Sequence, residues 1–454
     1  MGTVVQPAGR PGAGPVVAQG AEAPAYASRQ SNLLVTAGRI LLSILKWLLI
    51  AVLALFSAAL IVVSLVWGPT HWALALVLVA MWGLVLGLFA LAPGRIGRGW
   101  TQVAVAAGFL LVGLFTIVVS QASSYTPAIV DAQGKPVPGS IASLEKVRLN
   151  GTDQWLSIRG ASTDNPVLLW LAGGPGGSQI STVRYHLGAL EERFVVVNWE
   201  QPGAGKSYHA VPHSDLTTER YISDGLALVR YLRERFGEDK VYLVGESWGS
   251  ALGVWMVQRE PGMFHALVGT GQMVDFLETE LADYRWALQQ AEARGDTKKV
   301  ADLKAQGPPP YSDGAVMKQA TYLLDGFAYM NSNPAINSDG WDTFQDLLSP
   351  DYGLYDKVNW ARGVLDSGNV IFPQLWAADV DLRQEAQRLQ VPVYFLIGRH
   401  DVNAPPALTE EYYALLDAPR KELIWFERSG HNPWVTEADR FADVVVNRVL
   451  AENR

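Results

Sequence analysis

Three apolar segments near the N-terminus constrain the fold of this chain more than any other feature. Residues 47–67, 72–92 and 101–121 contain no charged side chain. Each is about 20 residues long, which is the length that an α-helix needs to cross the core of a lipid bilayer. The segments are apolar on every face and follow one another closely, which favours membrane spans over buried core helices. The sequence therefore predicts three transmembrane helices, with the lipid bilayer as a partner.

The basic residues around these segments predict their orientation. Those before the first segment and between the second and third are Arg29, Arg39, Lys46, Arg95 and Arg98. The loop 68–71 contains neither Lys nor Arg. Because basic residues concentrate in cytoplasmic loops, we expect the N-terminus in the cytoplasm and everything after residue 121 outside it. The prediction is a multi-pass protein of the cell membrane with an extracytoplasmic C-terminal part.

The rest of the chain alternates between strand and helix patterns. Strands are predicted at 145–149, 155–159, 167–171, 194–198, 241–244, 266–269, 393–397 and 422–426. Such alternation is typical of an α/β fold with a mainly parallel sheet and helices on both faces. Helices are predicted at 218–236, 276–295 and 298–305.

Shifts in composition divide the chain into parts. Residues 1–30 are rich in Gly, Ala and Pro and predict disorder. The strand signal fades between the sixth and seventh predicted strands, which indicates a helical insertion over the sheet. The predicted parts are a disordered cytoplasmic tail (1–46), the three spans, a linker (122–140), an α/β core in two pieces (141–271 and 390–454) and a helical cap between them (272–389).

Composition and motifs exclude several functions. The net charge of −8 and the lack of a Lys/Arg block argue against nucleic-acid binding. The chain has no cysteine, which rules out disulfides, a thiol nucleophile and thiolate-bound metals. It also lacks the Rossmann glycine pattern and an H-E-x-x-H motif. We therefore expect neither a metal nor a cofactor.

The segment Gly245-Glu-Ser-Trp-Gly249 has the pattern of a nucleophile elbow. It follows a predicted apolar strand and precedes a predicted helix. On such a turn the serine hydroxyl projects from the sheet edge, and the helix behind it directs free N–H groups at developing negative charge. The flanking glycines avoid collisions with neighbouring backbone. Ser247 is the predicted nucleophile.

A base and an acid follow Ser247 in the chain order that this type of site requires. Asp401 and His431 each come just after a late predicted strand, at the sheet edge where catalytic groups gather. We expect His431 to take the Ser247 proton and Asp401 to orient the imidazole. His400 is a weaker candidate for the base, because it sits beside the acid on the same loop.

The oxyanion of an acyl-transfer intermediate needs N–H donors, each worth about 3–4 kcal/mol. The backbone N–H of Trp248, the residue after the nucleophile, is the first expected donor. The second is expected from Leu171-Ala-Gly-Gly-Pro-Gly-Gly-Ser178, which follows the third predicted strand. We assign Gly174 there, with Gly173 as the next choice.

Together these motifs resemble the proline iminopeptidase family of α/β-hydrolases (serine peptidase family S33-type). They are Gly173-Gly-Pro-Gly-Gly177, Trp199-Glu-Gln-Pro-Gly-Ala-Gly-Lys-Ser207, Gly245-Glu-Ser-Trp-Gly-Ser250, Gly398-Arg-His-Asp401 and Gly430-His431. The resemblance covers about residues 145–275 and 390–450. It implies an α/β-hydrolase fold, a Ser247, His431 and Asp401 triad, a helical cap, and release of N-terminal proline from peptides.

Two positions depart from the family pattern. Ala172 stands where the family usually has histidine, and Pro202 where it usually has arginine. The carboxylates that would hold a peptide's free amine cannot be aligned. Glu278 and Glu280, early in the cap, are candidates for that role, and solvated helix charges are the alternative.

The sequence thus favours a membrane-anchored extracytoplasmic serine hydrolase that works through an acyl-enzyme. The preferred substrate is a small peptide, cleaved by an aminopeptidase of the proline iminopeptidase type. Two alternatives stay open: a carboxylesterase or lipase-like hydrolase of lipophilic esters, and a non-catalytic hydrolase-like receptor.

Overall fold

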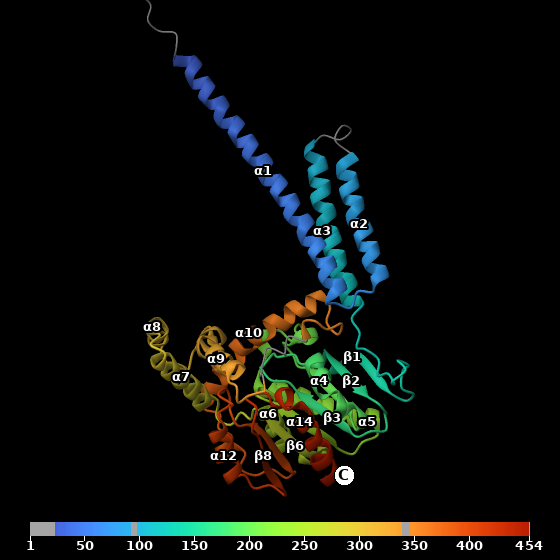
Figure 1. The fold of residues 1–454 in the computed structure, drawn as a ribbon, viewed down its shortest axis with the longest axis vertical. Helices are drawn as coiled ribbons and strands as arrows, with labels where there is room; N and C mark the ends of the chain where they lie inside the picture. The colour runs from blue at the N-terminus through green and yellow to red at the C-terminus, as the bar shows by residue number, and fades with distance from the viewer. Residues whose placement is uncertain (1–22, 92–97, 338–345, 454) are drawn as a thin grey trace, which may run out of the picture. The chain divides into compact units, whose positions relative to one another are not determined.

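A computed structural model describes residues 23–91, 98–337 and 346–453 (Figure 1). Part of the predicted tail (1–22), the last residue of the second predicted span (92) and the basic loop residue Arg95 lie outside the described residues. The chain divides into two compact units. One joins residues up to 58 with residues 81–112, and the other joins residues 59–80 with residues 113–454.

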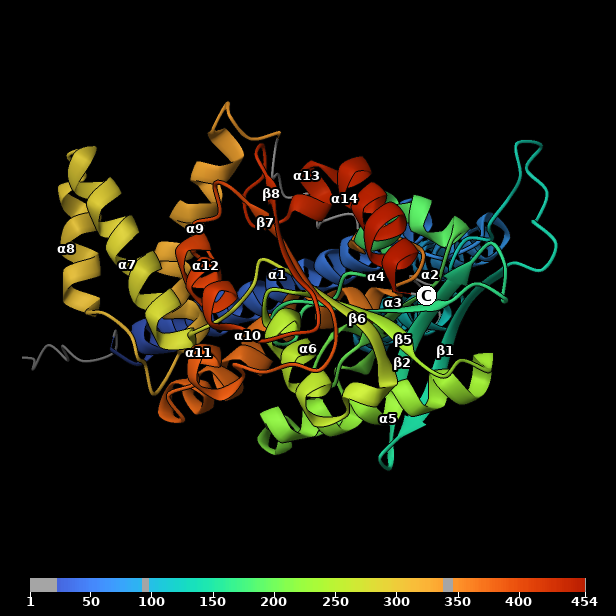
Figure 2. The same ribbon diagram turned by 90° about the horizontal axis from the view of Figure 1, so that it is seen from below.

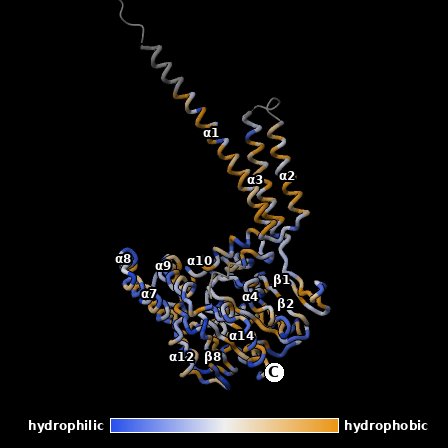
Figure 3. The backbone as a smooth tube through the Cα atoms, viewed as in Figure 1, coloured by the Kyte–Doolittle hydropathy of each residue, from blue (hydrophilic) through white to orange (hydrophobic). Residues whose placement is uncertain are grey.

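Three N-terminal helices are long and apolar enough to cross a membrane. They are α1 (Ala23–Val66), α2 (Trp72–Leu91) and α3 (Arg98–Ala122), whose tubes are mostly hydrophobic in Figure 3. The prediction of a disordered tail is wrong for residues 23–46, because α1 already begins at Ala23. The predicted span starts after Arg39 and Lys46 because the prediction required a segment without charges. Charged residues do not interrupt a backbone helix, and no proline follows Pro24 within α1.

Inside the first unit the apolar helices pack closely. The indole N–H of Trp82 on α2 donates to Ala54 O and to Ser57 Oγ on α1, at 3.1 Å each. The Trp82 ring also lies 5.6 Å from the Phe109 ring on α3, between centroids. Small residues and side-chain hydrogen bonds of this kind are what holds membrane helices together, since lipid provides no hydrophobic drive for their association.

The rest of the chain is built on one eight-stranded sheet in the order β1-β2-β4-β3-β5-β6-β7-β8. The strands are β1 (Ile141–Leu149), β2 (Thr152–Gly160), β3 (Val167–Leu171), β4 (Val195–Glu200), β5 (Val241–Glu246), β6 (Phe264–Thr270), β7 (Val393–Gly398) and β8 (Lys421–Phe426). β1 and β2 are antiparallel, and β4, β3, β5, β6, β7 and β8 run parallel. All eight predicted strands are confirmed, as is the mainly parallel sheet.

Helices cover both faces of the sheet, as Figure 2 shows. They are α4 (Ile180–Leu187), α5 (Thr218–Phe236), α6 (Trp248–Arg259), α12 (Pro406–Leu415), α13 (Pro433–Thr436) and α14 (Ala438–Val444). Alternate residues of β3 belong to different cores: Leu169 and Leu171 to the one containing α5 and α6, Leu168 and Trp170 to the one containing α4 and α14. Because side chains on both faces of such a strand lie in the core, functional residues are found in the loop after its carboxyl end.

In the described residues between β6 and β7 lie five α-helices, which we call the cap helices. They are α7 (Phe276–Ala293), α8 (Thr297–Gln306), α9 (Ala315–Ser332), α10 (Leu354–Ala377) and α11 (Leu382–Glu385). The predicted helices 276–295 and 298–305 correspond to α7 and α8, and helix 218–236 corresponds to α5. Asp275 caps α7 by accepting from the backbone N–H of Glu278.

Candidate active site

Ser247 lies on a sharp turn between β5 and α6. Its backbone angles are φ 51° and ψ −121°, a conformation that is strained for a residue with a side chain. A Cβ on Gly245 would lie 2.3 Å from Gly249 O, and one on Gly249 would lie 2.2 Å from Leu171 O. Only glycine fits at either position, so both glycines of the motif serve to bring this turn against the sheet.

His431 and Asp401 come together on the loops that follow β8 and β7. His431 Nδ1 lies 2.9 Å from Asp401 Oδ2, and both side chains are buried. The other oxygen of Asp401 accepts from the backbone N–H groups of Asn403 and Ala404, at 2.8 and 2.9 Å. Asp401 therefore contacts three donors, and one of them is the ring nitrogen of His431.

The two loops touch through backbone. A Cβ on Gly398 would lie 1.8 Å from Gly430 O, so this glycine permits the close approach. His400 N also donates to Ser429 O at 3.0 Å. The His400 side chain itself is not among the described residues that line the cavity beside Ser247, whereas His431 is. The arrangement favours His431 as the base.

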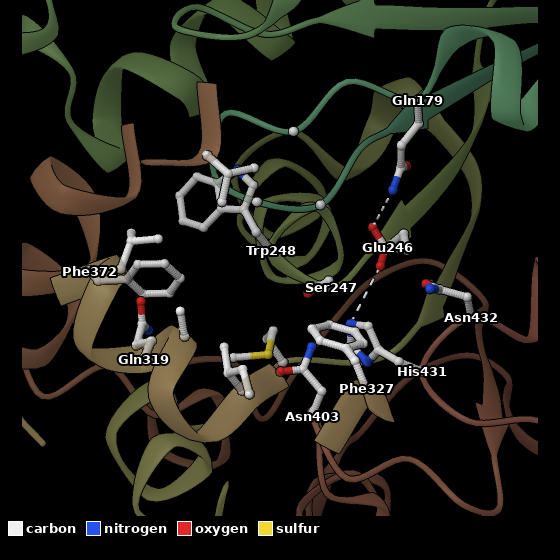
Figure 4. A pocket seen from close by; sticks show the side chains of 18 of the residues that line it. Gln179, Glu246, Ser247, Trp248, Gln319, Phe327, Phe372, Asn403, His431 and Asn432 are labelled. Carbon is white, nitrogen blue, oxygen red and sulfur yellow. Dashed lines mark hydrogen bonds and ion pairs between the residues drawn. The ribbon is translucent and has the colours of Figure 1, made fainter. Parts of the chain in front are cut away.

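Glu246, which precedes the nucleophile, is a functional candidate that the sequence reasoning missed. Its Oε1 lies 3.5 Å from His431 Nε2, and its Oε2 accepts from Gln179 Nε2 at 2.9 Å (Figure 4). Burial raises the pKa of the Glu246 carboxyl, while the charge of His431 acts to lower it. His431 thus stands between two carboxylates. The variable position of a G-x-S-x-G motif gives no sign of this, because the partners are remote in sequence.

The glycine-rich loop after β3 lies against the nucleophile. A Cβ on Gly173 would lie 2.2 Å from Glu246 Oε2 and 3.1 Å from Ser247 Cβ. Gly174 has φ 131°, which favours glycine. Gly173, Gly174 and Trp248 all line the same cavity as Ser247. The predicted oxyanion donors therefore share the cavity wall with the serine.

Gln201 links this loop to the elbow. Its side-chain amide donates to Ala172 O at 3.0 Å, and its Oε1 accepts from the indole N–H of Trp248 at 3.0 Å. All three residues are buried. Gln201 therefore holds the two segments that carry the proposed oxyanion donors at a constant separation, which explains why the glutamine belongs in this position.

Glu200, beside Gln201, is a fully buried acid behind the cavity. Tyr352 OH donates to its Oε1 at 2.8 Å, while Ser178 Oγ and the backbone N–H of Lys206 donate to its Oε2 at 3.2 and 2.8 Å. Burial raises the pKa of Glu200 to about 7. The acid joins the loop after β3, the loop after β4 and the segment before α10.

A cavity of about 450 Å³ extends from Ser247 to the cap helices. Its cap side is largely apolar, with Leu323 and Phe327 from α9 and Trp360, Val364 and Phe372 from α10 among the lining residues. In Figure 4 Phe372 and Gln319 lie across the cavity from His431. The volume suits a small molecule or the end of a longer one.

The two candidate amine ligands in the cap differ in position. Glu280 is buried and lines the cavity, where it accepts from Gln319 Nε2 and, at 2.5 Å, from Tyr322 OH. Glu278 pairs with Arg383 at 2.6 Å and is not among the described cavity-lining residues. One helical turn beyond Glu280, Asp283 is buried with no hydrogen-bond partner for either oxygen among the described residues.

Comparisons with known proteins agree with this geometry. The family model described as "alpha/beta hydrolase fold" matches residues 166–305. A probable aminopeptidase of Bacillus subtilis (strain 168), YbaC, is 29% identical over 315 residues, which is 68% of this chain and 97% of that protein. A probable proline iminopeptidase of Leptolyngbya boryana is 26% identical over 274 residues, covering 58% of this chain and 81% of that protein.

Among solved structures, a proline iminopeptidase of Mycobacterium smegmatis aligns with a TM-score of 0.47 and 16% identity, over 68% of this chain and 99% of that one. The sheet order and the family match define the class: this chain contains an α/β-hydrolase domain and is a hydrolase. Among its curated relatives, more narrowly, are a probable proline iminopeptidase and a probable aminopeptidase, at modest identity.

Proposed function

We propose that this protein is a membrane-anchored serine aminopeptidase that releases an N-terminal residue from small peptides outside the cytoplasmic membrane. The hydrolase chemistry is supported by the strained Ser247 turn and by the His431–Asp401 contact of 2.9 Å. The peptide preference is supported by the relatives, which carry aminopeptidase names, and by the buried carboxylate of Glu280 in the cavity.

In this proposal Ser247 Oγ attacks the carbonyl carbon of the N-terminal residue while His431 Nε2 takes its proton. The backbone N–H groups of Trp248 and Gly174 stabilise the oxyanion of the tetrahedral intermediate. His431 then gives the proton to the leaving amine, and an acyl-enzyme remains. Water, activated by the same histidine, hydrolyses the acyl-enzyme and restores Ser247.

Glu280 is the single observation that carries the choice of a peptide over other acyl compounds. Burial raises the pKa of Glu280 to about 7. A substrate ammonium group beside it would hold it as a carboxylate and complete an ion pair in a low-dielectric site. Asp283, one turn away on α7, is buried without a donor among the described residues, and burial raises its pKa well above the ordinary value.

The extracytoplasmic placement rests on the distribution of basic residues around the three apolar helices. Arg29, Arg39 and Lys46 precede the first helix, and the loop 68–71 has no Lys or Arg. Protease added outside intact cells should cleave the hydrolase domain under this topology. A domain that stays intact there, and is cleaved after the cells are opened, contradicts the placement.

A second candidate, hydrolysis of lipophilic esters, is favoured by the apolar cap side of the cavity. Leu323, Phe327, Val364 and Phe372 offer hydrocarbon contacts that a small peptide does not require. The same Ser247 chemistry would cleave an ester, because the acyl-enzyme step does not depend on the leaving group being an amine.

The deciding experiment compares proline anilide with a short acyl ester, using the full chain in detergent. The aminopeptidase proposal expects kcat/KM for the anilide to depend on a free substrate amine, so an N-acetylated anilide should be a poor substrate. Ester turnover without anilide turnover, lost in Ser247→Ala, would replace the peptidase by the esterase. Failure of Ser247 to react with a fluorophosphonate on folded protein would favour a non-catalytic receptor.

A further inference from the structure

The end of α3 is fastened to the start of cap helix α10. Ser120 Oγ accepts from the backbone N–H of Leu354 at 3.0 Å, and Gln121 Oε1 accepts from that of Tyr355 at 3.1 Å. Gln121 Nε2 also donates to Asp356 Oδ1 at 2.9 Å. Two residues at the end of the apolar helix α3 thus cap α10, so the first turn of α10 lies beside the end of a candidate membrane span.

An ion pair inside the domain holds this junction in place. Lys206 Nζ lies 2.7 Å from the other oxygen of Asp356 and 3.0 Å from Ser124 Oγ. The Lys206 and Asp356 side chains are buried, and removing either partner of such a pair is costly. The first turn of α10 is therefore positioned by the spanning helix on one side and by the α/β core on the other.

Apolar side chains are exposed at this junction. Tyr355 and Val358, in the first turns of α10, are 42% and 52% exposed, and Leu348, just before the helix, is 49% exposed. Large apolar side chains grouped beside the end of a spanning helix are suited to the lipid interface, where aromatic rings such as Tyr355 are enriched.

The same helix leads from the junction to the mouth of the cavity. Ala361, one turn after Val358, and Val364 both line the cavity and are exposed at its rim. Leu324 on α9 does the same from the opposite side and is 50% exposed. From Tyr355 to Val364 the helix advances about 14 Å. Exposed apolar positions on α10 therefore extend from its junction with α3 to the cavity that contains Ser247.

We propose that the lipid surface covers the exposed residues Leu348, Tyr355 and Val358, and that substrate passes from the lipid layer along α10 into the cavity. The substrate class that fits is an amphiphile, whose apolar tail follows the path between α9 and α10 while its polar end reaches Ser247. This inference rests on the proposed hydrolase chemistry of Ser247 and, for its substrate, on the second candidate, a lipophilic ester, whose source it specifies. Its lipid contact is tested independently of turnover.

The first test measures lipid contact directly. Because the chain has no cysteine, Val358→Cys in the full chain takes a single environment-sensitive fluorophore. Leu415→Cys is the matched control, since Leu415 at the end of α12 is 53% exposed and no interaction with the spanning helices is found for it in the described part of the chain. In nanodiscs, a quencher carried on the lipid acyl chains should quench the label at 358 and leave the label at 415 nearly unchanged. Equal quenching at both positions, or none at 358, overturns the proposal. The absence of quenching at 358 is also the result expected if a second copy of this chain covers the patch.

The second test concerns access. Val358→Glu places a charge at the proposed lipid contact without altering a residue that lines the cavity. Turnover of a long-chain ester embedded in vesicles should fall about tenfold, while turnover of a short soluble ester stays within twofold. Leu415→Glu should change neither rate. An unchanged rate on the embedded ester overturns the access route. A wild-type chain that turns over neither ester, with the lipid quenching intact, overturns the amphiphile substrate. The hydrolase function is contradicted only when the anilide turnover and the fluorophosphonate labelling of Ser247 fail as well.

Discussion

The buried acids on the sheet side and on the cap side of the cavity differ in their hydrogen bonding. On the sheet wall, Asp401 accepts from His431 and from two backbone N–H groups, and Glu246 is held by Gln179 and faces His431. On the cap side, Glu280 lines the cavity and has two side-chain donors, while Asp283, one turn further along α7, is not among the lining residues and has no donor among the described residues. Asp283 accordingly has its pKa raised well above the ordinary value, with burial as the main cause.

This difference suggests that the sheet side carries out the reaction and that the cap side selects the substrate. Fully bonded acids on the sheet wall give a site in which the reacting groups need no rearrangement, which is what electrostatic preorganisation requires. On the cap side, the Glu280 carboxyl faces the cavity, where a ligand can contact it. Substitutions on the two walls should therefore change different kinetic constants.

The largest effect is expected from Ser247→Ala on the sheet wall. Turnover should fall by about 10⁶-fold, because the nucleophile is lost and only binding and the oxyanion donors remain. Steady-state kinetics on both substrate types would measure it. The thermal unfolding midpoint should move by only a few degrees, which shows that folding is intact. Residual activity within tenfold of the original would mean that another residue is the nucleophile.

On the cap wall, Glu280→Gln should lower kcat/KM for a substrate with a free amine by about 100-fold, since a buried ion pair loses one partner. The rate on an N-acylated or ester substrate should change little. Glu278→Gln is the matched control and should leave both rates within twofold, because Arg383 keeps its contacts with Asp381 and Glu411. Equal losses on both substrates would make Glu280 a structural residue.

A smaller effect is expected from Glu246→Gln. As a carboxylate 3.5 Å from Nε2, Glu246 stabilises the imidazolium form of His431. Without that charge, the imidazolium loses its proton more readily, so the acid limb of the pH profile of kcat/KM should move to lower pH by about one unit. Glu427→Gln, at an exposed surface pair with Arg399, should leave the limb in place. If the acid limb stays in place or moves to higher pH, Glu246 does not stabilise the imidazolium form of His431.

The smallest effect concerns stability at Glu200. Burial raises its pKa from the ordinary 4.5 to about 7, so between these pH values the folded state holds a proton that the unfolded chain has lost. The fold therefore loses stability as pH rises through this window, by at most about 3 kcal/mol from this group. Glu200→Gln removes the titration, and its amide still accepts from Ser178 and Lys206 through one oxygen. The unfolding midpoint of Glu200→Gln relative to wild type should rise by a few degrees between pH 5 and pH 8. A difference in unfolding midpoint that does not change with pH would contradict the raised pKa of Glu200.

Sequence patterns predicted the α/β-hydrolase fold because its strands are short, apolar and bounded by turn residues. The turn at Ser247 and the order Ser247, Asp401, His431 were visible because each stands just after a strand, at one edge of the sheet. The triad roles and the oxyanion donors remain predictions, since geometry alone does not measure catalysis. The prediction missed the length of α1, because a segment without charged residues marks only the part of a helix that lies in the bilayer core, and α1 begins well before that part.

The buried acids were out of reach of the sequence for a different reason. Glu246 meets Gln179 across 67 positions and His431 across 185, so no local pattern reveals the contacts. Glu280 and Glu278 look alike in the sequence, yet one turns into the cavity and the other toward Arg383. Which face of α7 is buried is decided by packing against α9 and α10, and that is a property of the assembled fold.

The junction between α3 and α10 also decides where the domain can be cut from its membrane helices. A soluble fragment that begins at residue 125 would lose Ser120 and Gln121, which accept from the first N–H groups of α10, and Ser124, which accepts from Lys206 Nζ. Each lost cap costs about 1 kcal/mol. A fragment that begins at Gly113 keeps them, at the expense of one exposed apolar helix end. Expression and crystallisation trials should begin from that earlier boundary, with the leftover turns made polar on the faces that do not touch α10.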